Sequence, residues 1–232
     1  MTDNSWVSFW NSQHSIYVNA RHFDAHYRDV ADRMLQLKPA RAANVLDFGC
    51  GEAMHADRVA AAVGQLYLCE AASRVRDHLR ERFGHLANVK VIGPEELAAM
   101  PAGSLDLIVA NSVSQYLTRD ELDDLLRSWR TLLSANGRLI LADVVPPGVS
   151  PISDVMALLR YAWSNGFLLA AFAGLVRTVL SPYRRIRAQL GITTYTEDEI
   201  TRKIDAAGFR TERLPFNFEH QPARISFVAT PR

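Results

Sequence analysis

The feature that most constrains this chain is an apolar segment that runs into an acidic residue and then into two glycines. The segment reads ANVLDFGCGEA over residues 43–53, with Asp47 followed by Gly49 and Gly51. Glycines after a strand leave the main chain open to a ligand, and the amides at the start of the next helix point outward. The segment therefore predicts a strand, a tight turn and a helix around a nucleotide-like molecule.

Short apolar runs without strict alternation recur along the first 145 residues, as in strands that are covered on both faces. The predicted strands are residues 45–47, 65–69, 89–92, 105–110 and 138–142. Apolar residues at helical spacing lie between them, at residues 54–63, 72–84 and 119–134, and we expect Ala135, Asn136 and Gly137 to stop the last of these helices. The alternation predicts an α/β fold with a doubly wound, mostly parallel sheet.

The C-terminal quarter predicts one more helix and a hairpin. Thr196 and Glu199 have the spacing of a capping box, and Gly208 supplies a left-handed stop, so a helix is expected from about residue 197 to 207. Residues 209–216 and 224–230 read as two antiparallel strands. The hairpin brings the predicted sheet to seven strands.

Length and composition limit the function. A chain of 232 residues with 48% hydrophobic content is expected to form one domain. Its net charge of +1 argues against a nucleic-acid substrate. The start of the chain lacks a secretory signal, and the two cysteines are not spaced as metal ligands, so we expect a reduced, cytoplasmic protein.

A second acidic residue supports the ligand interpretation of the glycines. Glu70 ends the second predicted strand, where a carboxylate accepts hydrogen bonds from both hydroxyls of a ribose. The glycine pair alone is equally compatible with tight packing of a helix on a strand. Together with Asp47 and Glu70 it favours a nucleotide-like ligand.

Four segments, VLDFGCGEA, LYLCEA, SLDLIVANSVSQYL and LLSANGRLILAD, carry a family resemblance. Over roughly residues 40–145, and again in the C-terminal helix and hairpin, the chain resembles the class I S-adenosylmethionine-dependent methyltransferases, in the small-molecule branch (methyltransferase type 11-like) that includes quinone-pathway enzymes. The resemblance implies a Rossmann-like methyltransferase fold, S-adenosyl-L-methionine as cofactor and methyl transfer to a small, apolar or aromatic acceptor. The atom that receives the methyl group is left open.

The resemblance also implies cofactor-binding positions. Gly49 and Gly51 approach the methionine end, Asp47 positions backbone or the ammonium group, and Glu70 holds the ribose. Asn111 and Ser112 lie beside the sulfonium and the path to the substrate. The neighbours Cys50 and Ala71 belong to the same segments, although neither Cys50 nor Cys69 is given a chemical role.

The chain departs from the family after the third strand, where an acid usually contacts the adenine amino group. Here the sequence reads Gly93, Pro94, Glu95, Glu96, and either glutamate can serve, with Glu95 preferred.

The N-terminal segment, residues 1–40, is rich in aromatic and histidine side chains. The resemblance implies a helical cap that folds over the cofactor, with Trp10, Tyr17 and Arg21 closing the pocket and Arg21 pairing with the cofactor carboxylate. An amphipathic helix on the sheet edge explains any single residue there equally well.

Methyl transfer depends mainly on positioning, so a general base is optional. For a hydroxyl acceptor the candidates are His22, His26 and His220, with Tyr116 as an orienting donor. His22 and His26 have the i,i+4 spacing of metal ligands, but Phe23 replaces the glutamate of H-E-x-x-H and no third ligand is evident, so no metal is expected.

Two other functional classes are compatible with the sequence. A nicotinamide oxidoreductase shares the glycines and Glu70, but Met54 stands where its fingerprint needs Gly or Ala. A binding module that holds S-adenosylmethionine without chemistry is the second alternative, since the sequence alone identifies no base.

Residues 150–192 form an insert before the C-terminal helix. Asn165 and Gly166 separate two strongly apolar predicted helices, and Ser181 and Pro182 begin a third, basic one. The apolar run 167–176 is too short to span a bilayer, and it needs a cover from the protein body, a second copy of the chain or a lipid-like ligand. We expect a lid that walls the acceptor site with Trp163, Phe167, Leu168 and Phe172, with peripheral membrane contact or a homodimer as further expectations.

Overall fold

The computed structural model describes residues 5–11, 17–179 and 191–232. Within them the strands form one sheet in the order β3-β2-β1-β4-β5-β7-β6. The strands are β1 Asn44–Phe48, β2 Gln65–Cys69, β3 Val89–Ile92, β4 Leu105–Asn111, β5 Leu133–Val144, β6 Phe209–Arg213 and β7 Ile225–Pro231. The first five pair in parallel, and β7 runs antiparallel between β5 and β6. This sheet confirms the predicted seven-stranded, doubly wound fold.

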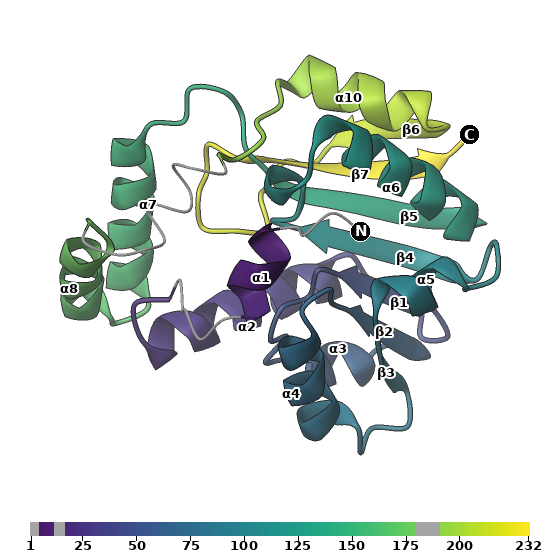
Figure 1. Ribbon diagram of the computed structural model, residues 1–232, viewed down its shortest axis with the longest axis horizontal. Coiled ribbons are helices and arrows are strands. Elements are labelled where there is room, and N and C mark those ends of the chain that lie inside the picture. Colours follow the sequence, from purple (N-terminus) through teal and green to yellow (C-terminus); the bar gives the residue numbers. More distant parts are fainter. Residues whose placement is uncertain (1–4, 12–16, 180–190) are drawn as a thin grey trace.

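Helices cover both faces of the sheet, and each face has its own apolar core. The helices are α1 Ser5–Asn11, α2 Ala20–Gln36, α3 Ala56–Ala60, α4 Ser73–Phe83, α5 Pro94–Ala98, α6 Arg119–Leu132, α7 Pro151–Ser164, α8 Leu168–Val179 and α10 Glu197–Ala206, with a short 3-10 turn at Ser114–Tyr116. One core joins the sheet to α2, α3 and α4, and the other joins it to α5, α6 and α10. In Figure 1, α6 and α10 lie on one side of the sheet and α3 and α4 on the other. Strands covered on both faces explain why the sequence shows apolar runs without alternation.

The structure differs from the sequence-based prediction at α3, at α5 and at the start of β5. The predicted helix 54–63 shortens to Ala56–Ala60, and an unpredicted helix, Pro94–Ala98, follows β3. The expected stop at Ala135, Asn136 and Gly137 is wrong, because these residues lie inside β5. Leu105 pairs with Leu133 and Leu107 with Arg138, so extra β5 residues bulge out of the ladder instead of forming a turn before it.

The capping prediction for the last helix is confirmed in part. Thr196 accepts a hydrogen bond from the Glu199 amide at 3.2 Å, and Gly208 has φ +92° at the end of the helix. The Glu199 carboxylate pairs with Arg119 on α6 instead of returning to the cap, because the two helices lie side by side.

The insert forms α7 and α8 as predicted, while most of its third, basic helix lies outside the described residues. In Figure 1 both helices stand at one end of the molecule beside the start of α2. Three contacts tie them to α2, namely Arg21 to the Gly166 carbonyl, Arg28 to Asn165 and Tyr161 to Asp29. Among the residues described, no helix combines the length and apolar character needed to cross a membrane.

The side of the insert that faces the protein body differs from the predicted one. Phe167 is 3% exposed and packs against the start of α2. Trp163 is 77% exposed and Phe172 52% exposed, so these two side chains do not wall a pocket. Leu158 and Asp154 on α7 line the central cavity in their place, because only this flank of α7 faces the sheet edge.

Candidate active site

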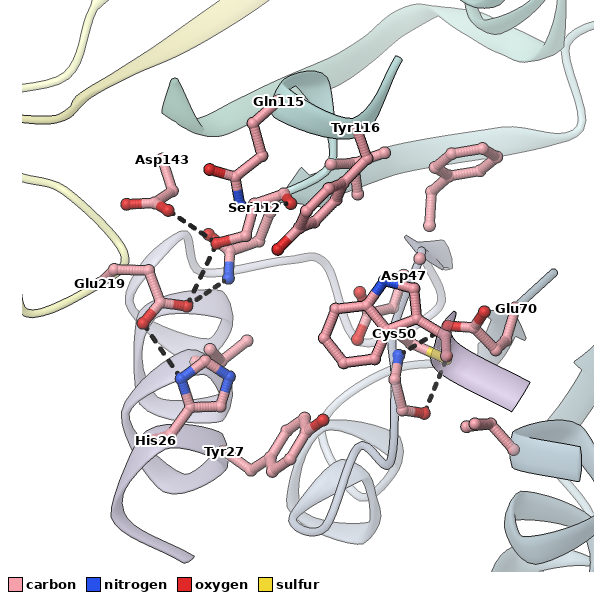
Figure 2. A pocket seen from close by; sticks show the side chains of 18 of the residues that line it. His26, Tyr27, Asp47, Cys50, Glu70, Ser112, Gln115, Tyr116, Asp143 and Glu219 are labelled. Carbon is pink, nitrogen blue, oxygen red and sulfur yellow. Dashed lines mark hydrogen bonds and ion pairs between the residues drawn. The ribbon is translucent and has the colours of Figure 1, made fainter. Parts of the chain in front are cut away.

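A cavity of about 450 Å³ opens at the carboxyl ends of β1, β2, β4 and β5, under α2 and α7. Figure 2 shows side chains from these elements converging on it. Most of the residues predicted from the sequence line this cavity: Tyr17, His22, His26, Asp47, Gly49, Cys50, Gly51, Glu70, Ala71, Asn111, Ser112, Tyr116 and His220. The fold thus brings the N-terminal residues 17–26, the residues 47–116 of the parallel strands and their turns, and the C-terminal His220 into one site.

The glycine turn after β1 is left-handed at both glycines, with φ +69° at Gly49 and φ +55° at Gly51. A Cβ on Gly49 would lie 2.7 Å from Val113, and a Cβ on Gly51 would lie 2.5 Å from the Tyr27 hydroxyl. The protein's own side chains therefore already require glycine at both positions. Packing, one of the two explanations that the sequence leaves open, therefore applies at both glycines.

Glu70 holds the turn from the neighbouring strand. Its Oε2 accepts a hydrogen bond from the Gly51 amide at 3.0 Å, and its Oε1 accepts one from the Ala72 amide at 2.9 Å. A carboxylate oxygen has two acceptor positions, so each oxygen keeps one for a further donor. The carboxylate is thereby oriented in the way that binding of a ribose diol requires, and this fits the implied cofactor.

Asp47 provides a second feature that fits the cofactor. It is 8% exposed and lines the cavity, and none of the described residues donates a hydrogen bond to its carboxylate. Burial, with a smaller contribution from the Glu70 charge, raises its pKa to about 7. A buried carboxylate in this state favours a cationic partner such as the ammonium group of the cofactor.

Opposite Asp47 and Glu70 lies a polar cluster in which five side chains from four elements contact one another. His26 Nδ1 lies 3.0 Å from Glu219 Oε2, and Asn111 Nδ2 donates to Glu219 Oε1 at 2.8 Å. Ser112 Oγ donates to Asp143 Oδ2 at 2.7 Å. Figure 2 shows Glu219 between His26 on one side and Ser112 on the other.

Asp143 sits at the base of this cluster and is fully buried. Besides Ser112 it contacts Arg224 in an ion pair, and Asn217 donates to its Oδ1 at 2.7 Å. Burial raises its pKa to about 6, although the Arg224 charge opposes that change. Two of these contacts come from the β6–β7 segment, which thereby closes one wall of the cavity.

Two strand ends in the cluster have an uncommon backbone. Ser112 has φ +57° and Asp143 has φ +60°, in the left-handed region that residues other than glycine seldom adopt. The hydrogen bond between their side chains joins the two strained positions across the β4–β5 edge. Such strain is concentrated at functional sites, where the surrounding contacts hold it.

The charges in the cluster shift in opposite directions. Burial by itself would raise the pKa of Glu219, but the His26 charge, the His26 hydrogen bond and the Asn111 hydrogen bond hold it well below its usual range. Burial would lower the pKa of His26, and the Glu219 carboxylate raises it overall. His22 has no such partner, and burial together with the charges of His220 and His26 lowers its pKa to about 4.

Two predicted residues lie outside the cavity lining. Arg21 donates from Nη1 to the Gly166 carbonyl at 2.9 Å and so anchors the insert, because it stands at the outer start of α2. Glu95 is exposed on α5, and only its neighbour Pro94 reaches the cavity. Glu96 caps α5 by accepting from the Gly93 amide at 2.6 Å, which explains the acid there without a ligand.

Sequence reasoning missed Glu219, Asp143 and Arg224. Asp143 had a signal, since it is an acid at the carboxyl end of a parallel strand, as are Asp47 and Glu70. Glu219 and Arg224 lie in and after an irregular loop whose position no local pattern reveals.

Comparison with known proteins identifies the fold family. Residues 46–139 match the family described as "Methyltransferase domain". The chain is similar to an uncharacterized methyltransferase of Anoxybacillus flavithermus, with 27% identity over 143 residues, which cover 60% of this chain and 64% of that protein. It is also similar to a probable non-canonical nonribosomal peptide synthetase of Salinispora arenicola, with 36% identity over 75 residues, which cover 32% of this chain and 1% of that protein.

A solved structure shows the same fold over the whole chain. Magnesium protoporphyrin IX methyltransferase from Synechocystis PCC 6803, with bound S-adenosylmethionine, matches at a TM-score of 0.60 and 16% identity, covering 100% of this chain and 98% of that one. The chain spans less than two thirds of the length of either curated relative, at 64% and 1%. Residues 46–139 thus match a methyltransferase domain, and the whole chain shares its fold with that solved methyltransferase.

Proposed function

We propose that this chain is an enzyme that transfers a methyl group from S-adenosylmethionine to a small-molecule acceptor, with residues 1–232 acting as one domain. The observation that carries the proposal is the pairing of the glycine turn with Glu70, whose carboxylate is oriented by the Gly51 and Ala72 amides at the edge of the cavity. When bound, S-adenosylmethionine supplies an activated methyl group on a sulfonium centre. The chain contributes binding, orientation and exclusion of water, and a base where the acceptor is a hydroxyl.

Three elements hold the cofactor in this proposal. Glu70 accepts hydrogen bonds from the ribose hydroxyls through the acceptor positions that the backbone amides leave open. Asp47 faces the ammonium group, and its buried carboxylate ionises fully as that charge arrives. Pro94, which lines the cavity where the family places the adenine, offers an apolar contact in place of Glu95.

The acceptor occupies the half of the cavity nearest α2 and α7. Aromatic side chains surround it, with Trp10 packed edge-on against Tyr116 at 5.9 Å between ring centroids and Tyr17 against Tyr27 at 6.0 Å. Such walls exclude water and favour a planar, apolar molecule. The solved relative, a magnesium protoporphyrin IX methyltransferase, supports a small-molecule acceptor.

Calorimetric titration tests the cofactor assignment. We expect S-adenosylhomocysteine to bind and NAD not to bind, whereas the reverse result would establish the nicotinamide alternative. Transfer of labelled methyl from S-adenosylmethionine to a panel of small aromatic metabolites then separates an enzyme from a binding module. Cofactor binding without transfer to any panel member would favour the module.

The exposed face of the insert supports a contact with an anionic membrane surface. The exposed large apolar residues recorded for the described residues all lie on α7 and α8: Ile152, Met156, Trp163, Leu169 and Phe172. Arginines 184, 185 and 187 follow them in the sequence, and apolar side chains flanked by basic ones suit anionic lipid. A homodimer is the competing explanation of the same face.

Sedimentation with vesicles of phosphatidylserine and phosphatidylcholine tests this contact. Vesicle binding that is lost in the double variant Trp163→Ser with Leu169→Ser supports the membrane contact. Conversion of a dimer to a monomer by the same double variant in light scattering would support the dimer.

Cys50 and Cys69 are buried and free of disulfides, which supports a reducing, cytoplasmic compartment for the protein.

A further inference from the structure

The polar cluster on the far wall of the cavity has an acceptor atom without a donor. Asn111 Nδ2 donates to the Glu219 carboxylate at 2.8 Å, and this fixes the amide, since the opposite orientation would place its oxygen against a carboxylate oxygen. Asn111 Oδ1 is then buried with no hydrogen-bond partner among the described residues. An unpaired buried oxygen is destabilising. Asn111 belongs to the cavity lining, so a bound molecule that brings a donor would relieve this cost once the side chains around the oxygen make room.

Three histidines line the cavity, and among the described residues only His26 of the three has a carboxylate within hydrogen-bonding distance. Its Nδ1 faces Glu219 Oε2 at 3.0 Å, and the side chains are 17% and 10% exposed. Glu219 accepts hydrogen bonds only, so Nδ1 carries the proton and Nε2 is the lone-pair nitrogen of the neutral ring. No hydrogen bond to Nε2 is recorded for the described residues.

His22 and His220 are less suited to accept a proton. His22 Nδ1 accepts a hydrogen bond from the Val18 amide at 3.3 Å, so the neutral ring carries its proton on Nε2 and acts as a donor. His220 stacks on Tyr161 with ring centroids 4.7 Å apart, and burial lowers its pKa. His26 alone combines an oriented ring with a pKa held up by a neighbouring acid.

The charge of this wall selects among acceptors. Three acids line it, Glu219, Asp143 and Asp154. The opposing charges are Arg224, which pairs with Asp143, and His26, which pairs with Glu219 and is charged only when protonated. A carboxylate or phosphate next to these acids would be repelled in a site of low polarity. A neutral molecule that donates a hydrogen bond fits this charge and would also supply the donor that the buried Asn111 oxygen lacks.

We propose that this cluster is the methyl-acceptor subsite, that the acceptor presents a phenol-type hydroxyl, and that His26 takes the hydroxyl proton while Glu219 positions the imidazole. The inference rests on the proposed function and deepens it. The O–H bond breaks and its proton moves to Nε2. The electron pair on the oxygen forms the new bond to the methyl carbon, and the pair of the broken carbon–sulfur bond stays on sulfur. A phenol, with a pKa near 10, is within reach of an imidazole base in a way that an aliphatic alcohol is not.

Histidine titration by NMR on the full, ligand-free chain tests the pair without any turnover. His26→Asn assigns the resonance. Glu219→Gln is expected to lower the pKa of His26 by about one unit or more, because it removes the adjacent opposite charge. The other charged groups that face His26 are Asp143, Asp29, His22 and His220. Asp29→Asn is the matched control, since it removes a carboxylate of the same helix that does not touch His26, and a clearly smaller shift is expected.

Turnover then tests the substrate class with cresol and naphthol against toluidine and toluate of matched size. We expect the phenols to be methylated. The methylation rate should fall by roughly 100-fold or more in His26→Asn. In Glu219→Gln the acid limb of the pH–rate profile should move to lower pH, by the same amount as the pKa of His26 measured by NMR. Both variants should bind S-adenosylhomocysteine as the wild type does, which shows that they are folded and that the cofactor half is intact.

Each failure has a distinct meaning. An unchanged pKa of His26 in Glu219→Gln overturns the pair, and methylation of toluidine or toluate but of neither phenol, or of no compound, overturns the acceptor class. Failure of the wild type to bind S-adenosylhomocysteine overturns the proposed function itself, and this inference with it.

Discussion

The Tyr27 hydroxyl occupies the space that a side chain on Gly51 would need. It lies 2.5 Å from the position of a Cβ there, and it accepts a hydrogen bond from the Glu52 amide at 2.9 Å. Helix α2 thus reaches across the sheet edge and fixes the turn after β1. The turn is therefore held by Tyr27 on α2 as well as by Glu70.

Gly51→Ala is therefore expected to lower the free energy of unfolding by more than about 1 to 2 kcal/mol, which is the cost of placing an alanine in the left-handed conformation. The clash with the Tyr27 hydroxyl adds to the backbone cost at φ +55°. Urea denaturation measures the effect. Tyr27→Phe in the same chain should recover the steric part only, and an equal loss with and without the hydroxyl would show that Tyr27 does not constrain the turn.

Glu70→Ala is expected to weaken S-adenosylhomocysteine binding by about 1 to 3 kcal/mol, because it leaves the ribose hydroxyls and two backbone amides without their acceptor. Calorimetric titration provides the dissociation constant. Glu95→Ala is the control, since Glu95 is exposed and outside the cavity lining. Equal effects of the two substitutions would contradict the placement of the ribose.

The contribution of Asp47 to the stability of the ligand-free protein should fall as the pH rises from about 4 to about 7. The pKa of Asp47 is raised from its ordinary value of 3.8 to about 7 in the folded state, so in this window the folded chain binds the proton more tightly than the unfolded chain does. Asp47→Asn removes this contribution, so the free energy of unfolding measured by urea denaturation should decrease less, or increase more, with pH over this window in the variant than in the wild type. A profile unchanged by the substitution would show that Asp47 is not desolvated.

The same carboxyl predicts how ligand affinity depends on pH. S-adenosylhomocysteine should bind more tightly as the pH rises through about 7, because Asp47 must be ionised to pair with the ammonium group. Calorimetry in buffers of different ionisation enthalpy should detect proton release on binding. Affinity that falls over this range would place the ammonium elsewhere.

Substitution by alanine is expected to have a large effect on stability at Phe167 and a small one at Phe172. Phe167 is 3% exposed and stacks on His22 with ring centroids 5.0 Å apart, so Phe167→Ala should cost about 3 to 5 kcal/mol or release the insert from α2. Phe172 is 52% exposed, and Phe172→Ala should change stability by less than about 0.5 kcal/mol. Thermal unfolding together with limited proteolysis of the insert distinguishes the two sites, and comparable effects would mean that α8 packs differently.

The sequence by itself determined the sheet and the half of the cavity that we propose for the cofactor. Asp47, Gly49, Gly51 and Glu70 follow directly on apolar strands, and the carboxyl ends of neighbouring parallel strands must meet at one edge. Their proximity is therefore fixed by local patterns and pairing order.

Only the tertiary structure decided the acceptor half. Asn111 and Glu219 are 108 residues apart in the chain, and they meet because the irregular loop before β7 folds over the carboxyl end of β4. Arg21 and Trp163 show the same limit. The family resemblance predicted Arg21 near the pocket, and the position after the fifth strand predicted Trp163 there. In the structure Arg21 donates to the Gly166 carbonyl and Trp163 is exposed to solvent. Side-chain direction in loops and caps depends on long-range contacts that have no period in the sequence, and this is why the polar cluster could not be read from it.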